Sequence, residues 1–163
     1  MEKAVAATDN PNKASNPSTW IKLAECYVNV YTYPQGGIGI GTPSMEARLF
    51  LKDQKVLSSE VKNYEYTSDT YEDKLVYYNP EGLVEIIQIT QPLNDKDNLE
   101  CAYNALMKAY EVDAKGSKKE DIAEHLLRAR DMCINEAMGA YTLGDVKTAN
   151  KYFEQSLKFY DNP

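Results

Sequence analysis

Residues 118–160, KKEDIAEHLLRARDMCINEAMGAYTLGDVKTANKYFEQSLKFY, hold two helical stretches separated by one short turn. In the first stretch, 118–142, apolar or small residues recur every three or four positions, namely at Ile122, Leu126, Ala129, Cys133, Ala137 and Ala140. In the second, 145–160, the corresponding residues are Val146, Ala149, Phe153 and Leu157. Gly144 and Asp145 form the turn, and so short a connection predicts two antiparallel helices, a helical hairpin.

Two further segments upstream show the same periodicity. One covers 17–33, where Ser18 or Thr19 is the expected N-cap, and the other covers 97–112. Their apolar faces are formed by Trp20, Leu23, Ala24, Tyr27 and Tyr31, and by Leu99, Ala102, Ala105, Leu106, Ala109 and Tyr110. The sequence therefore predicts a mainly α fold of antiparallel helix pairs.

The segment 34–95 between these helices has a different character. It holds 5 basic and 10 acidic residues, so it carries -5 of the formal net charge of -7. Lys74–Asn79 and Leu83–Thr90 are β-branched and aromatic runs around Pro80 and Gly82, which predicts a hairpin with a bulge. Ser59–Thr67 is a candidate third strand, and 45–52 a short helix. We expect one helical domain, 1–163, with a small antiparallel β insertion, and α+β content overall.

The composition excludes several classes of function. The chain has 163 residues, of which 43% are hydrophobic and 26% charged, and this is typical of one globular domain. An acidic balance disfavours binding to nucleic acid or to an anionic membrane surface. No apolar run approaches the about 20 residues that span a bilayer, and no apolar stretch precedes Ala4–Ala6 as a signal peptide requires.

Two motifs resemble the tetratricopeptide repeat. Trp20-x2-Leu23-Ala24-x2-Tyr27 is similar to the first-helix pattern W-x2-L-G-x2-Y, and Ala149-x3-Phe153 is similar to the second-helix pattern A-x3-F. The 75 residues from Tyr27 to Ala102 far exceed the spacing within one repeat, so the insertion splits a repeat. The chain in this respect resembles uncharacterised bacterial tetratricopeptide-repeat proteins with a β-rich insertion.

The resemblance implies a non-enzymatic scaffold for protein–protein interaction, in a bacterial protein that is exported. Cys26, Cys101 and Cys133 show no pairing pattern and favour a reducing compartment, so periplasm and cytoplasm both stay open. Residues 4–11 and 156–163 both end in Asp-Asn-Pro. We therefore expect the first residues to form the last turns of a helix, as in a longer repeat array.

In such repeats the first helix of each pair faces a bound peptide. The positions that this implies are Ile21, Glu25, Val28, Asn29, Asp131, Asn135, Met138 and Thr142. The family's clamp for a C-terminal carboxylate also needs Lys and Arg at these places, which this set lacks, so that ligand is disfavoured. The alternative is that these residues form an ordinary solvated helix face.

A second candidate surface is a cluster of tyrosines in the insertion. Its members are Tyr64, Tyr66, Tyr71, Tyr77 and Tyr78. Exposed tyrosines are typical of protein interfaces and of sugar stacking, so the alternative function is carbohydrate or small-ligand binding, with self-association through the insertion also open. A third interpretation is that these rings only pack against the protein's own helices.

Few features of the sequence indicate catalysis or a bound cofactor. His125 is the only histidine, and with Asp121 one turn away it supplies two metal ligands where a site needs at least three. No strained nucleophile turn is present. The glycine-rich segment 33–41 lacks the preceding strand and the following Lys of a phosphate-binding loop, which favours a connector. We expect no enzyme activity, no cofactor and no metal.

Overall fold

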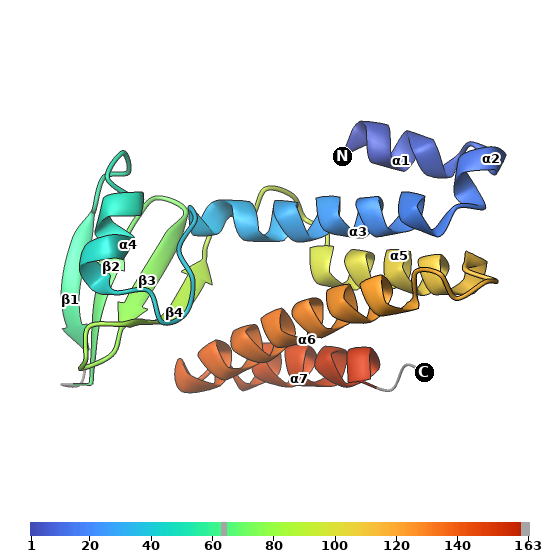
Figure 1. The fold of residues 1–163 in the computed structure, drawn as a ribbon. Helices are drawn as coiled ribbons and strands as arrows, with labels where there is room; N and C mark the ends of the chain where they lie inside the picture. Colours follow the sequence, from blue (N-terminus) through green and yellow to red (C-terminus); the bar gives the residue numbers. More distant parts are fainter. Residues whose placement is uncertain (63–64, 161–163) are drawn as a thin grey trace. The chain divides into compact units, whose positions relative to one another are not determined.

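The computed structural model describes residues 1–62 and 65–160, which form two compact units (Figure 1). The helical unit comprises Met1–Tyr31 and the chain from Lys96 onward, and the sheet unit comprises Thr32–Asp95. The helical unit contains α1 (Glu2–Thr8), α2 (Pro11–Ala14), α3 (Pro17–Thr32), α5 (Asn98–Val112), α6 (Lys119–Thr142) and α7 (Val146–Tyr160). The mainly helical class with a small antiparallel sheet is therefore confirmed.

The four long helices begin and end within two residues of the predicted bounds. One detail at the start of α3 was wrong, since the cap is neither Ser18 nor Thr19. The side-chain oxygen of Asn16 accepts a hydrogen bond of 3.0 Å from the backbone N–H of Ser18. Asn16 thus satisfies one of the amide groups that the first turn leaves without an intrahelical partner.

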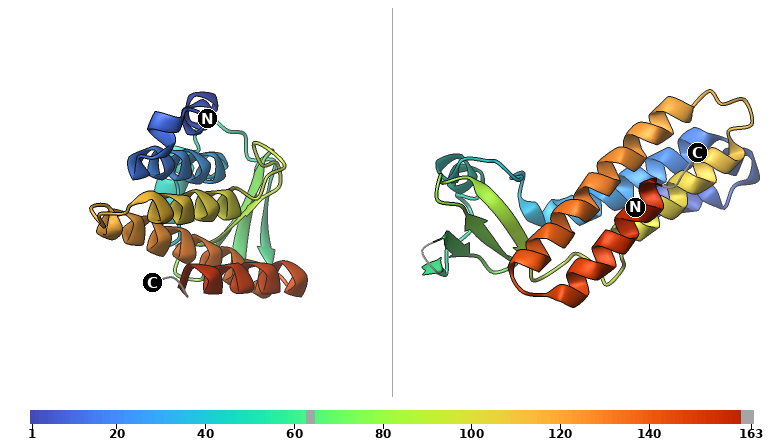
Figure 2. Two further views of the ribbon diagram at one scale, coloured as in Figure 1. Left: turned by 90° about the vertical axis from the view of Figure 1, so that its right-hand side faces the viewer. Right: turned by 90° about the horizontal axis from the view of Figure 1, so that it is seen from below.

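Polar contacts show how the two helix pairs are related. Along α3 and α6, Glu25 contacts His125 and Tyr31 contacts Glu136, so the contacts follow the same order in both helices and the helices run parallel. Along α5 and α7, Lys151 contacts Asp97 and Lys158 contacts Glu100, again in the same order. Helix α6 therefore runs parallel to α3, and α7 runs parallel to α5 (Figure 2).

Small side chains line the contacts between these helices. Ala24, Ala102, Ala109 and Ala129 are almost completely buried in one apolar cluster, together with larger residues such as Leu99, Leu106 and Ile122. Trp20, Tyr27 and Tyr31 are half-buried and pack against the same cluster. The small alanine side chains leave space between the helices, and the aromatic rings fill it. No helix in the described part of the chain is long and apolar enough to cross a membrane.

The predicted inward face of α7 was wrong in part. Ala149 is buried, but Val146, Phe153 and Leu157 are 56%, 36% and 60% exposed. The buried side of α7 is formed instead by Ala149, Gln155, Ser156 and Phe159. The physical reason is that α7 packs on α6 and α5 along one side only, while its apolar residues extend beyond that side.

The sheet unit contains the 3₁₀-helix η1 (Tyr33–Gln35), α4 (Ser44–Phe50) and four strands in the order β1-β2-β3-β4. The single strand expected over 59–67 was wrong, because two strands, β1 (Ser58–Lys62) and β2 (Tyr66–Thr70), form there. The hairpin of β3 (Lys74–Tyr78) and β4 (Val84–Ile89) is confirmed, with Gly82 at a φ of 77° in its turn. The glycine-rich connector ends on β4, since the N–H of Gly41 donates to the carbonyl of Val84.

The expected bulge sets which side chains share a face of the sheet. Tyr78 pairs with Val84 and Tyr77 with Ile86, so Glu85 is the extra residue. The extra residue shifts Val84 onto the face that also carries Ile87, which strict alternation would not predict. On that face, Val76, Tyr78, Val84 and Ile87 pack with Ala47 and Leu51 into a second apolar cluster.

Overpacking one of the buried alanines tests the helical arrangement. We expect Ala129→Leu to lower the free energy of unfolding by about 1–3 kcal/mol, because the site has no room for three more carbon atoms. Equilibrium urea unfolding followed by circular dichroism measures the loss. Ala123→Leu on the exposed side of α6 is the matched control and should stay within about 0.5 kcal/mol of the wild type. Equal stability of the two variants would contradict the packing.

Candidate functional site

The α3–α6 face is the surface on which the sequence placed its candidate binding residues. We define it by Glu25, Asn29, Asp131, Asn135, Met138 and Thr142, and all six are exposed. Ile21 and Val28, which the resemblance also placed there, are buried in the core of the helical unit. That part of the prediction was wrong, because both residues lie on the side of α3 that packs against the other helices.

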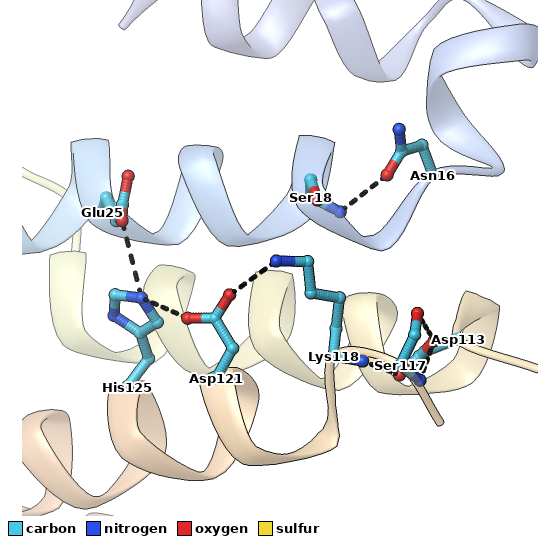
Figure 3. Close-up of polar contacts among 8 residues, drawn as sticks. All are labelled: Asn16, Ser18, Glu25, Asp113, Ser117, Lys118, Asp121 and His125. Carbon is cyan, nitrogen blue, oxygen red and sulfur yellow. Dashed lines mark hydrogen bonds and ion pairs between the residues drawn. The ribbon is translucent and has the colours of Figure 1, made fainter. Parts of the chain in front are cut away.

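The half of this face near the start of α6 is occupied by the protein's own charges (Figure 3). His125 Nε2 lies 3.5 Å from Glu25 Oε1 on α3 and 3.6 Å from Asp121 Oδ1 one turn earlier on α6. Lys118 Nζ lies 3.1 Å from Asp121 Oδ2. The two helices are thus joined by alternating acidic and basic groups, and these side chains are already engaged with one another.

The loop before α6 is fixed by Asp113, which the sequence did not single out. One carboxylate oxygen accepts from the backbone N–H and the hydroxyl of Ser117, and the other accepts from the backbone N–H of Lys118 at 2.7 Å (Figure 3). A carboxylate at this place also complements the positive end of the helix dipole. Asp113 therefore holds Lys118 where its side chain reaches Asp121.

The other half of the face, toward the end of α6, is less engaged. Asp131 is contacted by its neighbour Arg130 at 3.0 Å, and the Thr142 hydroxyl donates to the carbonyl of Met138. The Asn135 amide makes no polar contact with any residue in 1–62 or 65–160. An exposed amide can both donate and accept hydrogen bonds, as a peptide backbone requires.

A buried polar cluster joins the same helices beneath this face. The hydroxyl of Tyr31 donates to Glu136 Oε1 at 2.5 Å, and both side chains are partly buried. Burial raises the pKa of Glu136, although the Tyr31 hydrogen bond and Lys151 partly offset this effect. Sequence analysis missed Glu136, yet a signal existed, because it is an acid directly beside Ala137 in the buried stripe of α6.

The thiol nearest to this cluster is unsuited to nucleophilic chemistry. Burial raises the pKa of Cys133 to about 12, so the group is a neutral thiol at physiological pH. Cys26, Cys101 and Cys133 are all free. Nowhere in residues 1–62 and 65–160 do three or more His, Cys, Asp or Glu side chains form a group that could hold a metal ion.

The described tyrosines of the sheet unit do not form one exposed surface. Tyr71, Tyr77 and Tyr78 are buried, and Tyr66 is half-buried with its hydroxyl 3.0 Å from Glu85. The expectation that these rings form a binding surface was wrong for Tyr71, Tyr77 and Tyr78, because all three are buried within the sheet unit. Tyr64 lies outside the described residues.

The sheet unit instead holds a buried carboxylate, Asp69, that pairs with the exposed Arg48. Asp69 on β2 receives two hydrogen bonds from Arg48 on α4, of 2.8 and 3.3 Å, and one of 2.7 Å from Ser59 on β1. Burial alone would raise the pKa of Asp69, but Arg48 and Ser59 bring it below its ordinary value. A buried carboxylate paired in this way fixes α4 on the sheet, which is a structural task.

No family model, curated protein or solved structure matches this chain. The function must therefore be argued from the residues and from the arrangement of the helices. Among the described residues of the two candidate surfaces, all six of the α3–α6 face are exposed, whereas Tyr66 is half-buried and Tyr71, Tyr77 and Tyr78 are buried.

The Glu136 contact predicts how stability depends on pH. Since its folded-state pKa is raised, the folded protein holds a proton that the unfolded chain releases, and stability should fall as pH rises through that folded-state pKa. The slope from this group is at most about 1.4 kcal/mol per pH unit. Glu136→Gln keeps an oxygen that can accept a hydrogen bond from Tyr31 and removes this contribution to the pH dependence of stability. Urea unfolding at a series of pH values between about 4 and 8 measures the change.

Tyr31→Phe is the matched control for this experiment. It removes the hydrogen bond and leaves the carboxyl, so the fall of stability with pH should persist. A Glu136→Gln variant with the same pH dependence as the wild type would contradict the assignment.

Proposed function

We propose that the helical unit is a non-enzymatic interaction scaffold of the tetratricopeptide-repeat type, which binds a peptide segment of another protein on the α3–α6 face. The observation that carries the proposal is Asn135, an exposed amide without a polar partner among residues 1–62 and 65–160. It stands one turn from both Asp131 and Met138, so polar and apolar groups are offered side by side.

The arrangement of the helices supports this proposal. Helices α3 and α6 are the first members of two helix pairs, they run parallel, and Asn29 on α3 is exposed like the positions of α6. An extended segment lying across two such helices would meet side chains from both. Its backbone would form hydrogen bonds with Asn135, and an apolar side chain would contact Met138, which is 53% exposed.

The contacts at the start of α6 indicate where the peptide would end. Glu25, His125, Asp121 and Lys118 are engaged with one another, so binding there would first have to break these contacts. The free half of the face, from Asp131 to Thr142, is where we place the peptide.

The alternative function, carbohydrate or small-ligand binding through the tyrosines, loses its main support. Sugar stacking needs exposed aromatic faces, and Tyr71, Tyr77 and Tyr78 are buried. The exported location implied by the resemblance remains a prediction.

A displayed library of random peptides tests the proposal. We expect selected peptides to lose at least about tenfold in affinity on Asn135→Arg, because the longer charged side chain replaces the amide that meets the peptide backbone. Fluorescence anisotropy with a labelled peptide measures the affinity. Asn104→Arg, the same change at an exposed position of α5, is the matched control and should bind like the wild type. Peptides that bind both variants equally, or a library that yields none, would refute the proposal.

A further inference from the structure

Helix α7 carries an apolar stripe that the rest of the helical unit leaves uncovered. Val146, Phe153, Leu157 and Tyr160 are 56%, 36%, 60% and 72% exposed. Their spacings of seven, four and three residues place them on one side of the helix. Helix α7 lies at the end of the helical unit opposite α1, with α6 and α5 on its inner side (Figures 1 and 2).

Two of the three lysines of α7 are turned toward α5. Lys151 Nζ lies 2.7 Å from Asp97, and Lys158 Nζ lies 2.9 Å from Glu100, so both are engaged by carboxylates at the start of α5. The stripe itself is apolar, and the third lysine, Lys147, lies at its border. A large exposed apolar patch of this kind is typical of an interaction surface.

The exposed area of the patch is close to the area that one partner contributes to a protein–protein interface. With Tyr141 in the last turn of α6 and Leu143 directly after that helix, which are 64% and 37% exposed, these six residues leave on the order of 650 Å² exposed. A standard interface buries about 800 Å² on each partner, of which about 65% is apolar in homodimers. The patch alone thus supplies the apolar area that one partner of a dimer needs.

Two charges beside the stripe give it a self-complementary pattern. Lys147 and Glu154 are seven residues apart and so lie on the same side of α7, at the border of the stripe. Within the described ranges neither has an ion-pair partner. If two copies of α7 pack antiparallel about a twofold axis midway between these positions, Lys147 of each copy meets Glu154 of the other.

The same register matches the apolar groups. It brings Leu157 of one copy to the turn of the other, where Leu143 is exposed, and it brings Tyr160 to Tyr141. We propose that the α7 stripe is the interface of a symmetric dimer of this chain, in which two α7 helices pack antiparallel. Twofold dimers with one self-complementary surface are the commonest assemblies of soluble proteins. The dimer uses a different surface from the α3–α6 face and does not depend on peptide binding.

Analytical ultracentrifugation of the full chain tests the proposal. We expect wild-type protein to shift with concentration from the 18.4 kDa monomer toward twice that mass. Leu157→Glu should raise the dimer dissociation constant by at least about 30-fold, because two charges would be buried without partners. Leu49→Glu, the same change at an exposed leucine of the sheet unit, is the matched control and should dimerise like the wild type.

A charge exchange tests the register. Lys147→Glu or Glu154→Lys alone should raise the dissociation constant roughly three- to tenfold, since like charges then meet across the axis. The double variant with both changes should restore wild-type association. Circular dichroism of each variant confirms that its helices are retained.

Several outcomes would overturn the proposal. A wild-type chain that remains a monomer at all concentrations would leave the stripe to a partner of another sequence. A dimer that survives Leu157→Glu, or that Leu49→Glu disrupts equally, would place the interface elsewhere. A double charge variant no tighter than the single ones would contradict the antiparallel register.

Discussion

Packing of the four long helices around one apolar cluster is the constraint on which the rest of the structure depends. Buried alanines on α3, α5 and α6 lie in this cluster, and Trp20, Tyr27 and Tyr31 pack against it. This packing makes α3 and α6 parallel neighbours, and that relation creates both the Glu25–His125 contact and the exposed α3–α6 face. The sheet unit has an apolar cluster of its own and a buried carboxylate, Asp69.

Much of the fold could be predicted from sequence, and the failures have identifiable causes. Long helices with a regular period were found within two residues, because their burial repeats along the chain. The single strand over 59–67 was wrong because β1 and β2 are largely polar, so the hydrophobic pattern could not show that this segment contributes to two strands. On α7 the apolar residues do recur with a helical period, but the sequence alone does not show whether another part of the chain packs against them.

The candidate site was predictable only in part. The resemblance to the repeat family placed Asp131, Asn135, Met138 and Thr142 at exposed positions of α6, and they are exposed, whereas it assigned Ile21 and Val28 to the wrong side of α3. The links between helices were not predictable, since the pairing of Glu25 with His125, or of Tyr31 with Glu136, joins residues about 100 positions apart. The tyrosines misled because composition does not reveal burial, and a phenol ring serves equally well in a core or at a surface.

We infer that the residues on both sides of the insertion form one helical body, and that this body folds independently of the insertion. Tyr31, near the end of α3, contacts Glu136 on α6, and Asp97, just before α5, contacts Lys151 on α7, so both sides of the insertion are tied to the C-terminal helix pair. The most direct test replaces Thr32–Asp95 with a short Gly/Ser linker and measures urea unfolding together with NMR contacts of the Tyr31 ring. We expect this shortened chain to unfold in one cooperative transition and to keep the contacts between Tyr31 and the side chains of α6. Loss of cooperative unfolding, or of those contacts, would contradict it.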